Sequence, residues 1–93
     1  MIGIVVGSKK FENPNFYQQV MWELTSLEVC DLIVMYFDPK TKSPISLLEL
    51  GLFARSEKII VVCPDGFWRK GNVEIVCNFY NIPLYSDIND ITL

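Results

Sequence analysis

The stretch from Cys30 to Ala54, CDLIVMYFDPKTKSPISLLELGLFA, decides the fold class because an apolar strand runs into a short turn and then a helix. The run Leu32–Phe37 is entirely hydrophobic, which is typical of a strand that is covered on both faces. Ser43 and Pro44 then fit the N-cap and the first residue of a helix. The pattern predicts a strand at 32–37 and a helix over about 44–55.

Two carboxylates lie around this strand-to-helix turn. Asp38 directly follows the strand, and in open parallel sheets ligands bind at the carboxyl ends of the strands. Glu49 lies in the apolar stripe of the helix, because apolar residues stand four and one before it and three and four after it. Asp38 is a candidate for function because it lies at this edge of the sheet. Glu49 is a candidate because covering an acid costs free energy. Asp31, at the opposite end of the strand, is interpreted as structural.

The rest of the chain repeats the alternation of strand and helix. Apolar runs at 2–6 and 58–63 are typical of strands, and 83–86 is a weaker fourth. Helices are predicted from a cap at Asn13-Pro14 to about Val29, and from about 72 to 80. The buried side of the last helix is expected to consist of Ile75, Val76, Phe79 and Tyr80. This order predicts one α/β domain over 1–93, with a mostly parallel four-strand sheet and helices on both faces, a three-layer arrangement.

Composition excludes several classes of function. The chain has 93 residues and a net charge of −3 without a long basic cluster, which argues against binding a nucleic-acid polymer but leaves single nucleosides and nucleotides open. Apolar runs reach only six residues, so no membrane contact is expected and the predicted location is cytoplasmic.

The cysteines and the lack of histidine limit the chemistry further. Cys30, Cys63 and Cys77 lack CxxC spacing and are bordered by apolar residues, so buried reduced thiols are expected. Without histidine the chain cannot use a Ser-His or Cys-His couple, and it lacks the commonest transition-metal ligand. We expect no metal and no cofactor, and carboxylates are the leading candidates for chemistry.

Two further turns and one helix residue are candidate binding positions. Gly7 and Ser8 follow the first strand, although no phosphate-binding glycine motif occurs in the chain. In the segment 64–72, PDGFWRKGN, Phe67, Trp68 and Asn72 either close over a base or ribose or form a tight turn whose aromatics fill the sheet edge. Glu23 borders the apolar stripe of the first helix and either points toward Glu49 or is a solvated surface group.

Three stretches together resemble the nucleoside 2-deoxyribosyltransferase-like family: WEL at Trp22–Leu24, the stretch Cys30–Ala54, and KIIVVCPDGFWRKGNVEIVCNFYNIPLY at Lys58–Tyr85. The resemblance covers most of the chain from about residue 13. It implies a small flavodoxin-like, half-Rossmann domain. In the family's transferases a glutamate within an E-[LI]-G motif attacks the anomeric carbon of the sugar, and that motif here is Glu49-Leu50-Gly51.

The resemblance implies a role for each acid. Glu49 would be the nucleophile, Asp38 or Glu23 would protonate or orient the departing base, and Gly51 would let a ligand or a neighbouring strand approach. The expected function is cleavage or transfer at the N-glycosidic bond of a (deoxy)nucleoside or nucleotide. The alternatives are a non-catalytic nucleotide or nucleotide-derivative binding module and a structural or interaction domain.

Relative to complete family members, the chain is expected to be shortened at the N-terminus. They begin with an additional strand, a glycine-containing turn and a helix, which this chain lacks or replaces with residues 2–10. A four-strand sheet in so short a chain leaves edges and apolar faces uncovered, so a homodimer or larger homo-oligomer is expected. Established transferases use side chains from a neighbouring subunit near the C-terminus, where this chain offers Asp87, Asn89 and Asp90.

Overall fold

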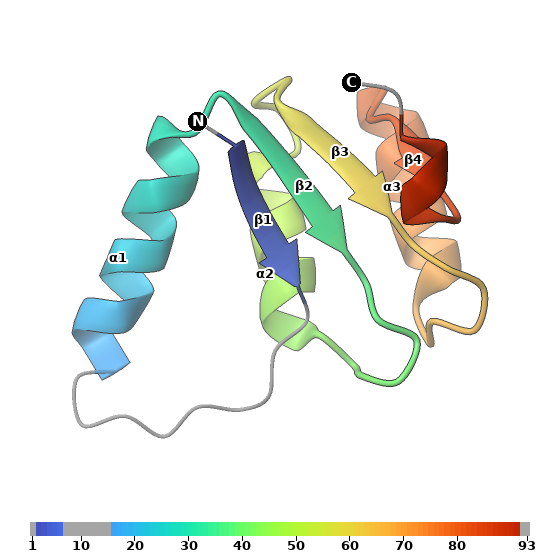
Figure 1. Cartoon of the computed structure of the whole chain (residues 1–93), viewed down its shortest axis with the longest axis horizontal. Coiled ribbons are helices and arrows are strands. Elements are labelled where there is room, and N and C mark those ends of the chain that lie inside the picture. Colours follow the sequence, from blue (N-terminus) through green and yellow to red (C-terminus); the bar gives the residue numbers. More distant parts are fainter. Residues whose placement is uncertain (1, 7–15, 92–93) are drawn as a thin grey trace.

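The structure is a computed structural model that describes the backbone of residues 2–6 and 16–91 and the side chains of residues 16–91. Strands and helices alternate along the chain as the sequence predicts (Figure 1). The elements are β1 (Ile2–Val6), α1 (Phe16–Val29), β2 (Leu32–Tyr36), α2 (Pro44–Phe53), β3 (Ile59–Val62), α3 (Lys70–Tyr80), β4 (Leu84–Tyr85) and the 3₁₀ turn η1 (Ile88–Asp90). The predicted cap at Asn13-Pro14 lies outside the described residues.

The strands form a parallel sheet in the order β1-β2-β3-β4. In its register Ile4 pairs with Val34, and Val34 pairs with Ile60. The strand β4 has only two residues and pairs in parallel with β3 through Val62 and Tyr85. The prediction that 2–6, 32–37 and 58–63 are neighbouring parallel strands is therefore confirmed.

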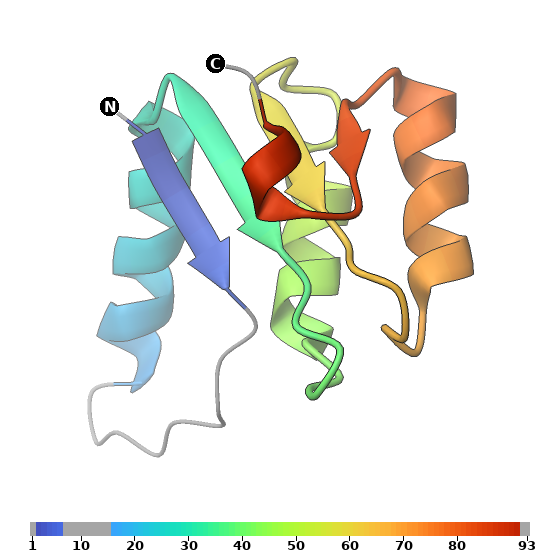
Figure 2. The ribbon, with the colours of Figure 1, turned by 45° about the vertical axis from the view of Figure 1, so that its right-hand side comes forward.

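All three α-helices lie on the same face of the sheet (Figure 2). Each crossover moves one strand further in the same direction, and right-handed crossovers of that kind place every helix on one side. The prediction of helices on both faces, and hence of three layers, is wrong for the described residues. The prediction rested on the idea that apolar strands need a helix on each side. On the side opposite to the three helices, Figure 2 shows the short turn η1 near β3 and β4.

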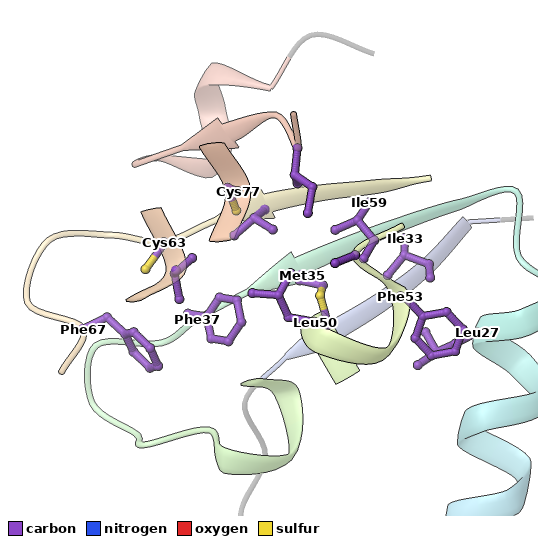
Figure 3. Packing of buried hydrophobic residues seen from close by; sticks show 14 of the residues in the cluster. Leu27, Ile33, Met35, Phe37, Leu50, Phe53, Ile59, Cys63, Phe67 and Cys77 are labelled. Atoms are coloured by element: carbon purple, nitrogen blue, oxygen red, sulfur yellow. The ribbon is translucent and has the colours of Figure 1, made fainter. Parts of the chain in front are cut away.

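The core lies between the sheet and the helices (Figure 3). Alternate residues of β2 and the turn after it, Ile33, Met35 and Phe37, are fully buried in it. The three cysteines are also buried free thiols, as predicted. Burial raises the pKa of Cys77 to about 11, so this thiol stays protonated and unreactive at neutral pH.

The helix α3 presents a different face to the core from the one predicted. Val73 and Cys77 are buried, with Val76 and Tyr80 packed beside them. These four residues follow the i, i+3, i+4, i+7 spacing of one helix face. Ile75 and Phe79 of the predicted set are 72% and 74% exposed, so that part of the prediction is wrong.

The helix α2 starts where the sequence predicts, but Ser43 acts differently. Pro44 is the first helical residue, and Ser43 at the N-cap has a left-handed backbone with φ of 48°. Its side chain makes no capping hydrogen bond and instead pairs with the Thr41 hydroxyl, with 2.7 Å between the oxygens. Within residues 2–6 and 16–91, no helix is both long and apolar enough to cross a membrane.

Candidate active site

The helix α2 carries its single acid on the side that faces the sheet. Ser46, Glu49, Leu50 and Phe53 are the buried residues of this helix, and only 7% of Glu49 is exposed. Of the four apolar residues that predicted this placement, only Phe53 is buried, whereas Ile45, Leu48 and Leu52 are 57%, 59% and 59% exposed. Glu49 is covered, as predicted, but the apolar stripe from which this was predicted is not the buried face of the helix.

Glu23 of α1 is the acid whose charge acts on Glu49. Glu23 is half-buried, and the amide of Gln19, one turn earlier, donates a hydrogen bond of 3.3 Å to its carboxylate. Burial, and then the negative charge of Glu23, raise the pKa of the Glu49 carboxyl above its ordinary value. The structure thus brings together two of the three predicted catalytic acids.

The surroundings of Glu49 favour the protonated form of its carboxyl group. Within residues 16–91 no hydrogen bond or ion pair involves the Glu49 carboxylate, so no cation offsets the cost of covering it. Burial and the negative charge of Glu23 both oppose the loss of its proton, so Glu49 holds that proton to a higher pH than an ordinary glutamate. Once ionised, the Glu49 carboxylate can act as a nucleophile.

Asp38 follows β2 at the carboxyl end of the sheet, where the sequence places it. Its carboxylate accepts a hydrogen bond of 2.9 Å from the amide of Lys40, and its carbonyl oxygen accepts one of 3.0 Å from the amide of Thr41. These bonds fold the turn that leads into α2. Asp38 shapes this loop, and among the described residues its charge is not one of those that raise the pKa of Glu49.

The predicted aromatic turn combines the two interpretations that the sequence allows. Phe67 is 4% exposed and packs against Phe37, with 5.1 Å between the ring centres, so its ring fills the core at the sheet edge. Trp68 is half exposed, and its indole N–H donates a hydrogen bond of 2.8 Å to the carbonyl of Lys42. Phe67 is therefore not available to stack on a base, whereas Trp68 is partly accessible, with Arg69 and Lys42 over its ring.

A hollow of about 300 Å³ lies between α2 and α3. It includes three of the predicted binding residues, Gly51, Trp68 and Asn72, but not Glu49. Gly51 lies about 200° around the helix axis from Glu49, since successive residues are about 100° apart. The residues that line the hollow are Leu47, Leu50, Gly51, Trp68, Arg69, Asn72, Val73 and Val76. The helix α2 thus separates this hollow from the Glu23–Glu49 pair.

Other site features were not anticipated from the sequence. Gln19 holds Glu23, and its spacing of four residues on one helix was the signal available. The ammonium group of Lys70 occupies the carboxyl end of β3, where it donates to the carbonyl of Cys63 and pairs with Asp65 at 3.2 Å.

Gly7 and Ser8, the predicted contacts after β1, lie outside the described residues. Residues 16–91 contain no cluster that could hold a metal ion.

The site belongs to a parallel α/β domain, with the buried Glu49 on α2 and the half-buried Glu23 on α1. Residues 6–67 match a family described as nucleoside 2-deoxyribosyltransferase like, and the chain belongs to that family. The match includes both glutamates and the turn at Asp38. No protein with a curated description matches the chain significantly.

Proposed function

We propose that this protein cleaves or transfers at the N-glycosidic bond of a (deoxy)nucleoside or nucleotide, with Glu49 as the nucleophile. The observation that supports this most strongly is the covered Glu49 carboxylate with the charge of Glu23 beside it. Family membership supports a small nucleoside as the partner molecule. A buried acid without a cation to balance it needs a reason, and covalent catalysis supplies one.

The proposed reaction has two steps. In the first, a Glu49 oxygen bonds to the anomeric carbon of the sugar while the bond from that carbon to the base nitrogen breaks. Asp38 or Glu23 protonates or orients the departing base, and a base that is only oriented takes its proton from water. In the second step a water molecule or another base attacks the same carbon, and the Glu49 carboxylate leaves, so the configuration of the sugar is retained.

The surroundings of Glu49 suit this role. Burial leaves the carboxylate little contact with water, and a poorly hydrated anion is better able to attack carbon. The same burial raises the pKa of Glu49, and only the ionised form is a nucleophile. Activity should therefore rise with pH as Glu49 loses its proton, and the rise should lie above the ordinary range for glutamate.

The assembly and the location in the cell also belong to the proposal. Large apolar side chains are exposed on α1 and α2, among them Trp22, which is 69% exposed, and Leu48 and Leu52, which are each 59% exposed. Such surfaces favour a homodimer or larger homo-oligomer. We propose that this assembly works in the cytoplasm, with Gly7 and Ser8 contacting substrate and residues near the C-terminus reaching a neighbouring subunit.

The low exposure of Glu49 favours one alternative, a binding module for a nucleotide or nucleotide derivative. With 7% of the residue exposed, a sugar reaches this carboxylate only if the surrounding side chains move. A protein that binds nucleosides but never cleaves them would fit that observation. An enzyme and a binding module would both bind nucleosides, but only the enzyme would convert them, so binding and turnover both have to be measured.

The test is incubation with a panel of deoxynucleosides and ribonucleosides, with and without a second free base, followed by chromatography of the products. Release of a free base, or appearance of a new nucleoside, supports the enzyme. Glu49→Gln should abolish it, and Glu74→Gln, the same change on an exposed residue of α3, should not. Binding without any product supports the binding module, and the lack of both contradicts the proposal.

A further inference from the structure

We propose that the hollow between α2 and α3 is a second ligand site, which takes a small anion with a flat apolar body, such as an aromatic carboxylate. It lies on the other side of α2 from Glu49, so the inference does not depend on the proposed chemistry. Three observations carry it: the lining of the hollow, the glycine in its wall and the cations at Trp68.

The lining suits an apolar body. Leu47 and Leu50 of α2 face Val73 and Val76 of α3 across the hollow, and Trp68 closes the end nearest the start of α3. A volume of about 300 Å³ is at the lower end of the range for small-molecule sites. One ring with a short substituent is therefore a better fit than a nucleotide.

Gly51 keeps the wall of the hollow open. Glycine inside a helix is unfavourable relative to alanine, and a Cβ atom added at this position would meet nothing within 4 Å. Gly51 is also absent from the glycines with a positive φ, so its backbone does not require glycine. Neither packing nor conformation within the described chain explains this residue, whereas close approach of a ligand does.

The charges near the hollow suit an anion. The guanidinium carbon of Arg69 lies 4.4 Å from the centre of the Trp68 ring, and the Lys42 ammonium lies 5.4 Å from it. No residue that lines the hollow is acidic. Within residues 16–91 neither cation forms an ion pair, so both can turn toward a bound carboxylate.

Trp68 is held in place before any ligand arrives. Its hydrogen bond to the Lys42 carbonyl ties the turn after β3 to the turn after β2, and the neighbouring Phe67 is anchored in the core. A ring that is already ordered loses little freedom when a ligand packs against it. The aromatic wall of the site is therefore preorganised.

The test is a titration of ¹⁵N-labelled protein with phenylacetate, followed by NMR, with neutral phenylacetamide as the matched compound. We expect phenylacetate to shift the indole N–H of Trp68 and the amide of Gly51, and to bind about tenfold more tightly than phenylacetamide because of the charge. Arg69→Gln should remove that preference, and Gly51→Leu should block both compounds by filling the hollow. Arg55→Gln, an exposed arginine on the turn after α2, is the control and should change neither affinity.

Several outcomes would overturn the inference. Equal binding of the two compounds would show that charge has no part, and shifts confined to residues outside the hollow would place the ligand elsewhere. Shifts of Trp68 and Gly51 that follow protein concentration without any ligand would show that a second copy of the chain fills the hollow. Unchanged amide shifts away from α2 in Gly51→Leu would establish that this variant folds, and Arg69→Gln tests the same site without altering the helix.

Discussion

Replacing Gly51 with alanine should stabilise the fold. Gly51 lies inside α2, where alanine is favoured over glycine by about 0.8–1 kcal/mol. The added methyl group would meet nothing within 4 Å, so no clash reduces this gain. For a domain of this size, a gain of that order should raise the melting temperature by about 4–8 °C.

Urea unfolding followed by circular dichroism measures this effect. The midpoint should move to higher urea while the slope of the free energy against urea concentration stays the same. Gly66→Ala is the contrasting control, because Gly66 has φ of 94° and alanine there is strained, so this variant should lose stability. If Gly51→Ala were less stable than wild type, the space beside Gly51 would not be empty and the reasoning about the hollow would fail.

Three further predictions follow from contacts around the site. The unfolding free energy of wild type should fall as pH rises from about 4.5 through the raised pKa of Glu49. In that interval the native state binds more protons than the unfolded chain, so raising the pH favours unfolding. Urea unfolding at a series of pH values measures this fall, which should be absent in Glu49→Gln. Phe67→Leu should cost about 1 kcal/mol through its lost ring contact with Phe37, yet leave nucleoside affinity unchanged in calorimetry because the ring is buried. Lys58→Met should cost about 1–2 kcal/mol in thermal unfolding, since the ammonium group donates to the carbonyls of Leu27 and Glu28 at the end of α1.

The sequence predicts the strands well because they depend on local patterns. A run such as Leu32–Phe37 has no alternative to burial. Glu49 is covered as predicted, but three of the four apolar residues on which that prediction rested are exposed, so local spacing alone does not identify the buried side of α2. The number of layers in the fold cannot be predicted from local patterns. It depends on the order of the strands in the sheet, and the same strands and helices are compatible with one covered face of the sheet or two.

The candidate site was predicted in part for the same reason. Helical spacing placed Glu23 beside the apolar stripe of α1, but only the packing of α1 against its neighbours shows that its charge acts on Glu49. Phe67 and Trp68 are adjacent and chemically alike in the sequence, yet one is buried and the other is half exposed. Nothing in the local pattern distinguishes two neighbouring aromatics at a turn, because the distinction arises from Phe37 and Lys42, which lie far away in the chain.

The central claim is that Glu49 itself bonds to the sugar, and mass spectrometry tests it most directly. A nucleoside with fluorine at the 2-position of a 2-deoxy sugar slows the second step, so the covalent intermediate should accumulate. Wild type should gain the mass of the fluorinated sugar on the peptide that contains Glu49, and Glu49→Gln should gain none. Release of base by wild type without any adduct, together with Glu49→Gln that turns over as fast as wild type, would contradict it.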